Sequence, residues 1–255
     1  MRMEDENIYN DIQKIFEDLP GNFNILEEQI DLEVQMKYFE RSKKLREENE
    51  GTDYLESREE LFLPDTGINR KKDILIGLAG MDDVKAYRII EKFLKQAGEE
   101  LRGWTVLALQ ENRMLLQTSL LEEQQFFIST GLGGKDRKLR YYVVFIGRDL
   151  DKLLTPTQQK LVKNELIFRL KPEEGEFESI DFFEGFCTSL VLLPVTADIK
   201  QVFSSVVEEC NQYGDFLEED MIITNVKVLS RNEILEIINK QDNSDFQDED
   251  ELEEE

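Results

Sequence analysis

Residues 141–147 read YYVVFIG, an unbroken apolar run rich in aromatic and β-branched side chains. Such a run predicts a β-strand, and because successive positions are apolar, both of its faces are expected to be buried. Downstream, Thr155, Pro156 and Gln158 supply an N-cap, a proline at the first helical position and a capping box. These signals predict a helix over residues 156–170, so a strand followed by a helix begins this half of the chain.

The same alternation continues toward the C-terminus. Two strands, FESIDFF and CTSLVLLPV, a helix over residues 197–213, a strand MIITNVKVL and a last helix capped by Ser230 and Glu233 are predicted in turn. The order strand, helix, strand, strand, helix, strand is that of ferredoxin-like domains. The strand QQFFIST, which precedes this series, is expected to extend the sheet. Residues 122–240 are therefore predicted to form a ferredoxin-like βαββαβ sheet domain with an extra strand, and the fold class is α+β.

The N-terminal half is predicted to be all helical. Residues 1–69 are interpreted as an acidic helical region and linker, with a short amphipathic helix over 4–18 and a long helix from Asn24 to Glu48. Residues 70–121 are predicted to form three helices in close succession, and Asp82 is the expected N-cap of the second. The sequences of these helices are NRKKDILIGLAG, DDVKAYRIIEKFLKQAGEE and LRGWTVLALQENRMLLQTSLL.

Part of this helical region resembles a known repeat. A helix, a turn with Gly80 and Asp82-Asp83, a helix ending near Glu99-Glu100 and then LRGWTVLALQENRMLL are similar to a HEAT-type repeat pair. HEAT-like repeats are binding scaffolds, so the resemblance implies a protein-binding surface over residues 70–121. One pair does not bury a continuous core, and ordinary helical packing is the alternative interpretation.

The C-terminal half carries a second resemblance. YYVVFIGRD, the helix after LLTPTQQ, the strand FCTSLVLLP and the helix IKQVFSSVVEEC follow the order found in single-strand-DNA transposases with a His-hydrophobic-His metal motif and a tyrosine nucleophile. Phe186 and Thr188 stand where the two histidines would be, and Tyr213 corresponds to the nucleophile. The resemblance implies a relative without metal or nuclease activity that keeps a nucleic-acid surface. The alternative is a shared architecture without shared function.

Composition restricts the chemistry. The chain of 255 residues has no histidine, which excludes histidine-dependent catalysis and histidine metal ligation. Its two cysteines form no spacing motif, which favours a reducing compartment. The N-terminus does not resemble a signal peptide, and the longest uncharged stretch, 185–197, is shorter than the roughly 20 residues of a membrane helix. We expect a cytoplasmic protein that does not enter a membrane, with no cofactor, no metal site and no catalytic residues.

The net charge of −25 is concentrated at the two ends of the chain. Residues 71–240 carry 22 Lys and Arg against 28 Asp and Glu, a balance of −6, whereas residues 241–255 carry 9 acidic residues and no basic ones. Residues 241–255 are predicted to be a disordered acidic tail. The alternative roles for this tail are a nucleic-acid mimic or a docking peptide for a basic partner.

One basic cluster stands out in the balanced middle region, STGLGGKDRKLR at residues 129–140. It is not a phosphate-binding P-loop, because the first glycine, the Ser or Thr after the lysine and the following helix are all missing. Backbone amides of its glycines with the nearby cations would still suit an anion. The candidate contacts are Gly131, Gly133, Gly134, Lys135, Arg137, Lys138 and Arg140. The alternative is a strand-to-strand turn with solvated charges.

These observations favour a non-enzymatic interaction or scaffold protein of the cytoplasm that binds a protein partner or forms a homodimer. The competing hypothesis is a nucleic-acid or phosphate-ligand binder that uses loop 131–140 with Tyr141, Phe126 and Phe127. The net charge disfavours nucleic acid.

Overall fold

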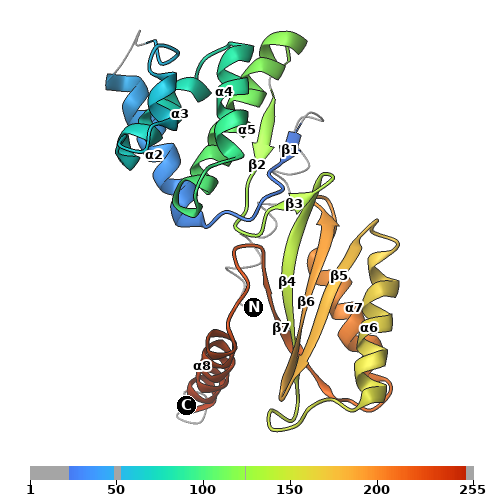
Figure 1. The fold of residues 1–255 in the computed structure, drawn as a ribbon. Coiled ribbons are helices and arrows are strands. Elements are labelled where there is room, and N and C mark those ends of the chain that lie inside the picture. Colours follow the sequence, from blue (N-terminus) through green and yellow to red (C-terminus); the bar gives the residue numbers. More distant parts are fainter. Residues whose placement is uncertain (1–22, 49–52, 124, 251–255) are drawn as a thin grey trace. The chain divides into compact units, whose positions relative to one another are not determined.

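The computed structural model describes residues 23–48, 53–123 and 125–250 and has a mixed α+β fold (Figure 1). The chain divides into two compact units. The first runs to Arg140 and includes Pro194–Ala197, and the second comprises Tyr141–Leu193 and the residues from Asp198 onward. The helix predicted over residues 4–18 lies outside the described residues. None of the helices in the described ranges has the length and apolar character needed to cross a bilayer.

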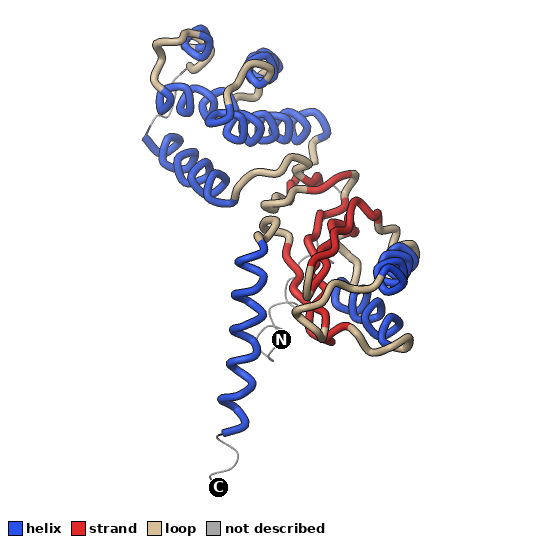
Figure 2. The backbone as a smooth tube through the Cα atoms, turned by 60° about the horizontal axis from the view of Figure 1, so that its bottom comes forward, coloured by secondary structure: helices blue, strands red, loops and turns tan. Residues whose placement is uncertain are grey.

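The first unit is built from helices around one apolar core (Figure 2). Its elements are α2 (Leu32–Glu48), the 3-10 helix η1 (Arg58–Phe62), α3 (Ile68–Ala79), α4 (Val84–Leu94) and α5 (Glu99–Leu121). α5 packs against α2, α3 and α4, while α3 also packs against α2 and α4. Tyr38, Leu61, Ile74, Ile90 and Leu107 lie fully buried in the core, and each such apolar side chain contributes about 1.5–3 kcal/mol. The three helices predicted over residues 70–121 are confirmed.

The start of α2 differs from the prediction. The long helix was expected to begin at Asn24, but residues 23–25 form the strand β1 (Phe23–Ile25), and α2 begins only at Leu32. The carboxylate of Asp31 accepts a hydrogen bond from the backbone N–H of Glu33 at 2.7 Å. Such a side-chain bond favours a helix start, since it satisfies a donor that the first turn leaves without a partner. The same mechanism places the N-cap of α4 at Asp83 rather than Asp82.

β1 pairs in parallel with β2 (Phe126–Ile128) in a separate two-stranded sheet. The prediction that the strand in QQFFIST extends the main sheet is therefore wrong. The main chain of β2 forms its hydrogen bonds with β1. One further hydrogen bond, from the N–H of Leu26 to the carbonyl of Ile128 at 2.9 Å, extends this pairing. The strand thus belongs to the first unit.

A buried amide closes the end of α3. Asn112, in the middle of α5, is fully buried and its Nδ2 donates to the carbonyl oxygens of Leu78, Ala79 and Met81 at 3.1, 3.2 and 2.7 Å. The last carbonyls of a helix have no partner within the helix. Asn112 adds a side-chain donor from the neighbouring helix to the backbone N–H groups that the carbonyls of Leu78 and Met81 already accept, and it ties the two helices together.

The second unit contains the larger sheet. Its elements are the greater part of β4 (Lys138–Gly147), then α6 (Pro156–Leu170), β5 (Glu176–Phe183), β6 (Phe186–Pro194), α7 (Ile199–Asn211), β7 (Leu217–Thr224) and α8 (Arg231–Asp250). From β4 to β7 the order of strands and helices is the predicted one. The predicted capping box at the start of α6 is confirmed, with Thr155 and Gln158 bonded reciprocally.

The sheet is antiparallel in its β4–β7 and β5–β6 pairs, and β4 lies between β7 and β6. β4 is buried at successive positions, as its apolar run predicts. α6 and α7 pack on each other and lie on one face of the sheet (Figure 1). The rings of Phe145 in β4 and Phe203 in α7 make an edge-to-face contact at 6.2 Å. The additional strand of this sheet is β3 (Gly134–Lys135), which pairs with the beginning of β4.

Two boundaries near the C-terminus also differ from prediction. β7 begins at Leu217, ahead of MIITNVKVL, because the side-chain oxygen of Asn211 accepts the N–H groups of Phe216 and Leu217 and fixes the turn before it. α8 starts at the predicted capping box of Ser230 and Glu233 and continues to Asp250. The tail predicted to be disordered from residue 241 is therefore helical up to Asp250, since a helix propagates more easily than it nucleates. Residues 251–255 lie outside the described residues.

Candidate functional site

The basic loop singled out in the sequence forms a tight β-hairpin. β3 and β4 are joined by Asp136 and Arg137, whose φ angles are 48° and 66°, and Lys135 pairs with Lys138 across the turn. Positive φ at both central residues is the signature of a type I′ turn, which matches the twist of two antiparallel strands. Residues 134–139 thus form a turn that connects two antiparallel strands.

The glycines of this loop allow close approach of the main chain. A Cβ on Gly133, which has φ of 65°, would lie 2.5 Å from the carbonyl oxygen of Glu27 and 2.8 Å from that of Glu28. A Cβ on Gly134 would lie 2.1 Å from the carbonyl oxygen of Lys138. Gly131 is buried as well. Carbonyl oxygens repel an anion, so the surroundings of Gly133 favour the turn interpretation over an anion-binding nest.

The cations of the hairpin have contacts within the first unit. Arg140 donates to the carbonyl oxygen of Leu132 at 2.7 Å, the guanidinium of Arg137 lies 4.3 Å from the ring centre of Phe23, and Lys135 lies 3.9 Å from the carboxylate of Asp136. The first two contacts hold the hairpin against its own unit. Lys138 is half-buried.

The aromatic rings named with this loop are used in packing. Phe127 contacts the ring of Phe39 at 6.1 Å, Phe126 is half-buried and Tyr141 is buried. Base stacking needs an open aromatic face. Because the rings of Phe126, Phe127 and Tyr141 are buried or half-buried, none of them presents a fully open face for base stacking.

The positions suggested by the transposase resemblance differ in their burial. Phe186 and Thr188 are buried in β6, and Tyr213 is exposed just beyond α7. Within the described ranges, no group of three or more His, Cys, Asp or Glu side chains is placed to hold a metal ion.

The two thiols lie in the core of the second unit. Cys187 in β6 and Cys210 in α7 are both buried and reduced. Burial raises the pKa of the Cys187 thiol far above its ordinary value, and it raises the pKa of Cys210 to about 12. A thiol is nucleophilic only as the thiolate. Both side chains therefore serve packing.

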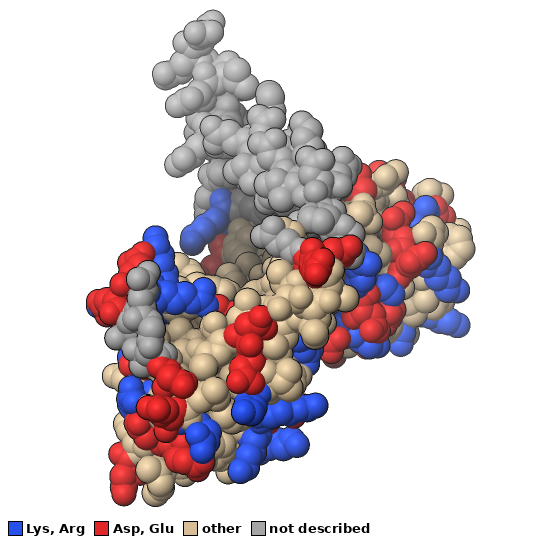
Figure 3. All heavy atoms as spheres, turned by 90° about the horizontal axis from the view of Figure 1, so that it is seen from above, with Lys and Arg blue, Asp and Glu red and all other residues tan. Residues whose placement is uncertain are grey.

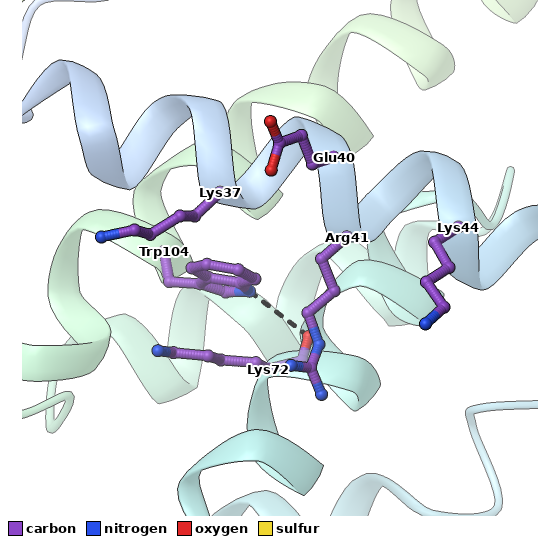
Figure 4. Close-up of a pocket in the computed structure, with 6 residues that line it drawn as sticks. All are labelled: Lys37, Glu40, Arg41, Lys44, Lys72 and Trp104. Atoms are coloured by element: carbon purple, nitrogen blue, oxygen red, sulfur yellow. Dashed lines mark hydrogen bonds between the residues drawn. The ribbon is translucent and has the colours of Figure 1, made fainter.

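A different cluster forms a concave site in the first unit (Figure 4). We call it the basic pocket. It has a volume of about 400 Å³ and is lined by Lys37, Glu40, Arg41, Lys44, Lys72 and Trp104. Four cations and one carboxylate meet there, giving a local charge of +3 in a chain whose net charge is −25. Lys37 and Lys72 extend past the indole in the same direction, while Glu40 points away from it (Figure 4).

Trp104 forms the floor of the basic pocket. It is 4% exposed, and its indole N–H donates to the carbonyl oxygen of Lys72 at 3.3 Å. The ring of Tyr38 contacts it edge-on at 5.2 Å, and the ammonium of Lys72 lies 4.8 Å from its centre. The indole is therefore fixed from three sides, and it holds Lys72 in place by a cation–π contact.

The cations of the basic pocket differ in their partners. Arg41 binds Asp73 through two hydrogen bonds of 2.6 and 3.0 Å, an arrangement that fixes the guanidinium between α2 and α3. Lys37 pairs with Glu33 on its own helix at 3.0 Å, and both side chains are more than 60% exposed. Exposed pairs of this kind contribute about 0.2–1 kcal/mol and exchange readily. For Lys72, no carboxylate partner is present among the described residues.

No motif in the sequence indicates the basic pocket. Lys37, Arg41 and Lys44 follow the spacing i, i+4, i+7, which places them in one stripe along a helix. This spacing of cations can be read from the sequence, but it is hard to recognise because α2 carries many other charged residues. Lys72 and the single tryptophan join the stripe only through the packing of α3 and α5 on α2.

A second depression of about 560 Å³ is also lined by cations. Arg58, Lys85 and Arg88 surround it together with Leu55, Val84 and Ile89. Arg88 is paired with Glu91 at 2.8 Å, and Arg58 lies 3.4 Å from Glu59. Because this depression lacks a buried aromatic floor, it serves below as a matched control site. Figure 3 shows that acidic and basic side chains are interspersed over the face seen from above.

Comparison of the sequence with known protein families gave no match, and comparison with curated proteins found no relative.

Proposed function

We propose that this is a non-enzymatic interaction protein of the cytoplasm whose helical unit binds an acidic segment of a protein partner in the basic pocket. The observation that carries the proposal is the Lys72–Trp104 arrangement. An ammonium without a carboxylate partner among the described residues is held on a fixed indole, beside three further cations, in a chain with 56 acidic residues. Complementary charge steers partners together and sets specificity.

The architecture supports the same proposal. The helices α3, α4 and α5 pack in succession, in keeping with a HEAT-like hairpin that presents a surface to a partner. The element order from β4 to β7 and the strand order β7, β4, β6, β5 support our assignment of a ferredoxin-like domain. We infer that this second domain has no catalytic role, since its two thiols are buried.

A titration tests the proposal. A fluorescein-labelled peptide rich in glutamate, followed by fluorescence anisotropy, should bind the full chain weakly, because a few exposed ion pairs contribute only about 0.2–1 kcal/mol each. Replacing Lys37 and Lys72 by serine should abolish binding, whereas replacing Lys85 and Arg88 by serine removes the same charge and should leave it largely intact.

The competing function has its own arm in the same assay. A labelled single-stranded oligothymidine of similar charge replaces the peptide, and Lys135, Arg137 and Lys138 are changed to serine. Loss of oligonucleotide binding in that variant, with no peptide binding by the unaltered chain, would overturn the proposal in favour of the nucleic-acid alternative.

A further inference from the structure

We propose that the acidic segment received by the basic pocket is residues 241–255 of a second copy of this chain, so that the protein associates with itself through its tail. The inference rests on the proposed function, since it assigns the occupant of the same pocket. The occupant is argued from charge and from helical spacing.

Charge complementarity is the first argument. The last 15 residues carry 9 Asp and Glu and no Lys or Arg, the strongest such imbalance at either end of the chain. The basic pocket carries four cations against one carboxylate. Positive and negative surfaces on two copies of one chain attract at low ionic strength, although the two whole molecules repel.

Helical spacing is the second argument. Lys37, Arg41 and Lys44 span seven residues of α2, which corresponds to about 10 Å along its axis. In the tail, Asp242, Asp245 and Glu249 follow i, i+3, i+7 and also span seven residues of α8. Residues at these intervals share one side of a helix. The acidic positions of the tail therefore match the spacing of the basic positions along α2.

The pocket can accept such a segment at little cost. The Lys37–Glu33 pair and the Lys44–Glu48 pair, at 3.0 and 3.8 Å, are both exposed and lie within α2. Exchanging these partners for carboxylates of the tail breaks no contact between helices. The Arg41–Asp73 pair stays in place and keeps α2 and α3 fixed while the tail binds.

Charge reversal with rescue tests the inference on the full chain. One variant carries Lys37→Glu and Lys72→Glu, and the other carries Asp242→Lys, Asp245→Lys and Glu249→Lys. Sedimentation velocity should show the unaltered chain associating at about 50 mM salt and dissociating at about 500 mM, where charges are screened over a few ångströms. Each variant alone should associate at least about tenfold more weakly.

The two variants mixed should associate again, because the three lysines introduced into one tail then face the two glutamates introduced into the pocket of the other copy. A matched control, Lys85→Glu with Arg88→Glu, changes the charge by the same amount at the second depression and should self-associate as the unaltered chain does. Far-UV circular dichroism, which reports the secondary structure of both units, establishes that each variant is folded.

The outcomes separate this inference from the proposed function. A chain that is monomeric at low salt, or an association that survives both variants, overturns self-recognition. A tail that binds the pocket of its own molecule gives a monomer and overturns it as well. If a free peptide of residues 241–255 nonetheless binds a chain shortened at Lys240 and loses binding on Lys37→Glu with Lys72→Glu, the proposed function stands and only the second copy is refuted.

Discussion

Replacing Gly133 by alanine should destabilise the first unit strongly. The residue has φ of 65°, and a Cβ there would lie 2.5 Å from the carbonyl oxygen of Glu27 and 2.8 Å from that of Glu28. The left-handed conformation costs an L-residue about 1–2 kcal/mol. Relieving two contacts with main-chain oxygens adds about 1–3 kcal/mol, because the backbone must move.

One contribution acts in the opposite direction. Alanine lowers the conformational entropy of the unfolded chain relative to glycine, which stabilises the folded state by about 0.4–1 kcal/mol. The net loss in the free energy of unfolding is about 1–4.5 kcal/mol. With a urea dependence of about 2 kcal/mol per molar, the midpoint of unfolding should fall by about 0.5–2 M.

The single tryptophan makes this measurement specific. Trp104 lies in the first unit, so its fluorescence in a urea titration reports that unit alone. Gly98→Ala is the matched control, because no atom lies within 4 Å of its Cβ position, and the change should stay below about 1 kcal/mol. A Gly133→Ala midpoint equal to that of the unaltered chain would refute the close approach on which the turn interpretation depends.

Three further predictions concern buried amide, thiol and capping groups. Asn112→Ala should lower the free energy of unfolding of the first unit by about 1–3 kcal/mol, because the carbonyls of Leu78, Ala79 and Met81 all lose a buried side-chain donor and those of Leu78 and Met81 keep only backbone N–H donors; an unchanged urea midpoint would contradict this. Cys187 and Cys210 should resist a thiol reagent at pH 8 in the folded protein and react after unfolding, since burial raises the pKa of both thiols; rapid labelling of the native chain would show that they are not inert. Bonding to Lys227 lowers the pKa of Glu233 from 4.5 to about 2, so its contribution to the start of α8 is present above pH 4.5 and is lost as the pH falls toward 2. An NMR titration of its carboxyl carbon should show a midpoint near 2, and a midpoint near 4.5 would argue against the cap.

Local signals in the sequence were sufficient for much of the fold. The capping boxes at Thr155 and Ser230 begin helices because they act within one turn, and the apolar run of β4 indicates burial on both faces without knowledge of its neighbours. The succession of helices over residues 70–121 likewise follows from periodicity.

Pairing between distant segments could not be read in the same way. Residues 23–25 look like the approach to a helix until the strand 126–128 is placed beside them. The same limitation hid the basic pocket, because Lys72 and Trp104 join the stripe of α2 only after three helices pack together. The sequence leaves the stretch 129–140 open between an anion site and a turn. It does not show why position 133 requires glycine, because the carbonyls of Glu27 and Glu28 that crowd this position are distant in the sequence.

The parallel pairing of β1 with β2 also has a consequence for synthesis. In its register Phe23 faces Phe126, 103 residues later in the chain. At a translation rate of about 5–20 residues per second, β1 waits about 5–20 s for its partner to be made. The helices α2 to α5 depend on shorter separations and can form during this interval, because local contacts are made sooner than distant ones. The helical unit is therefore closed last by its first strand, and a nascent chain that stalls within α5 leaves that strand without a partner.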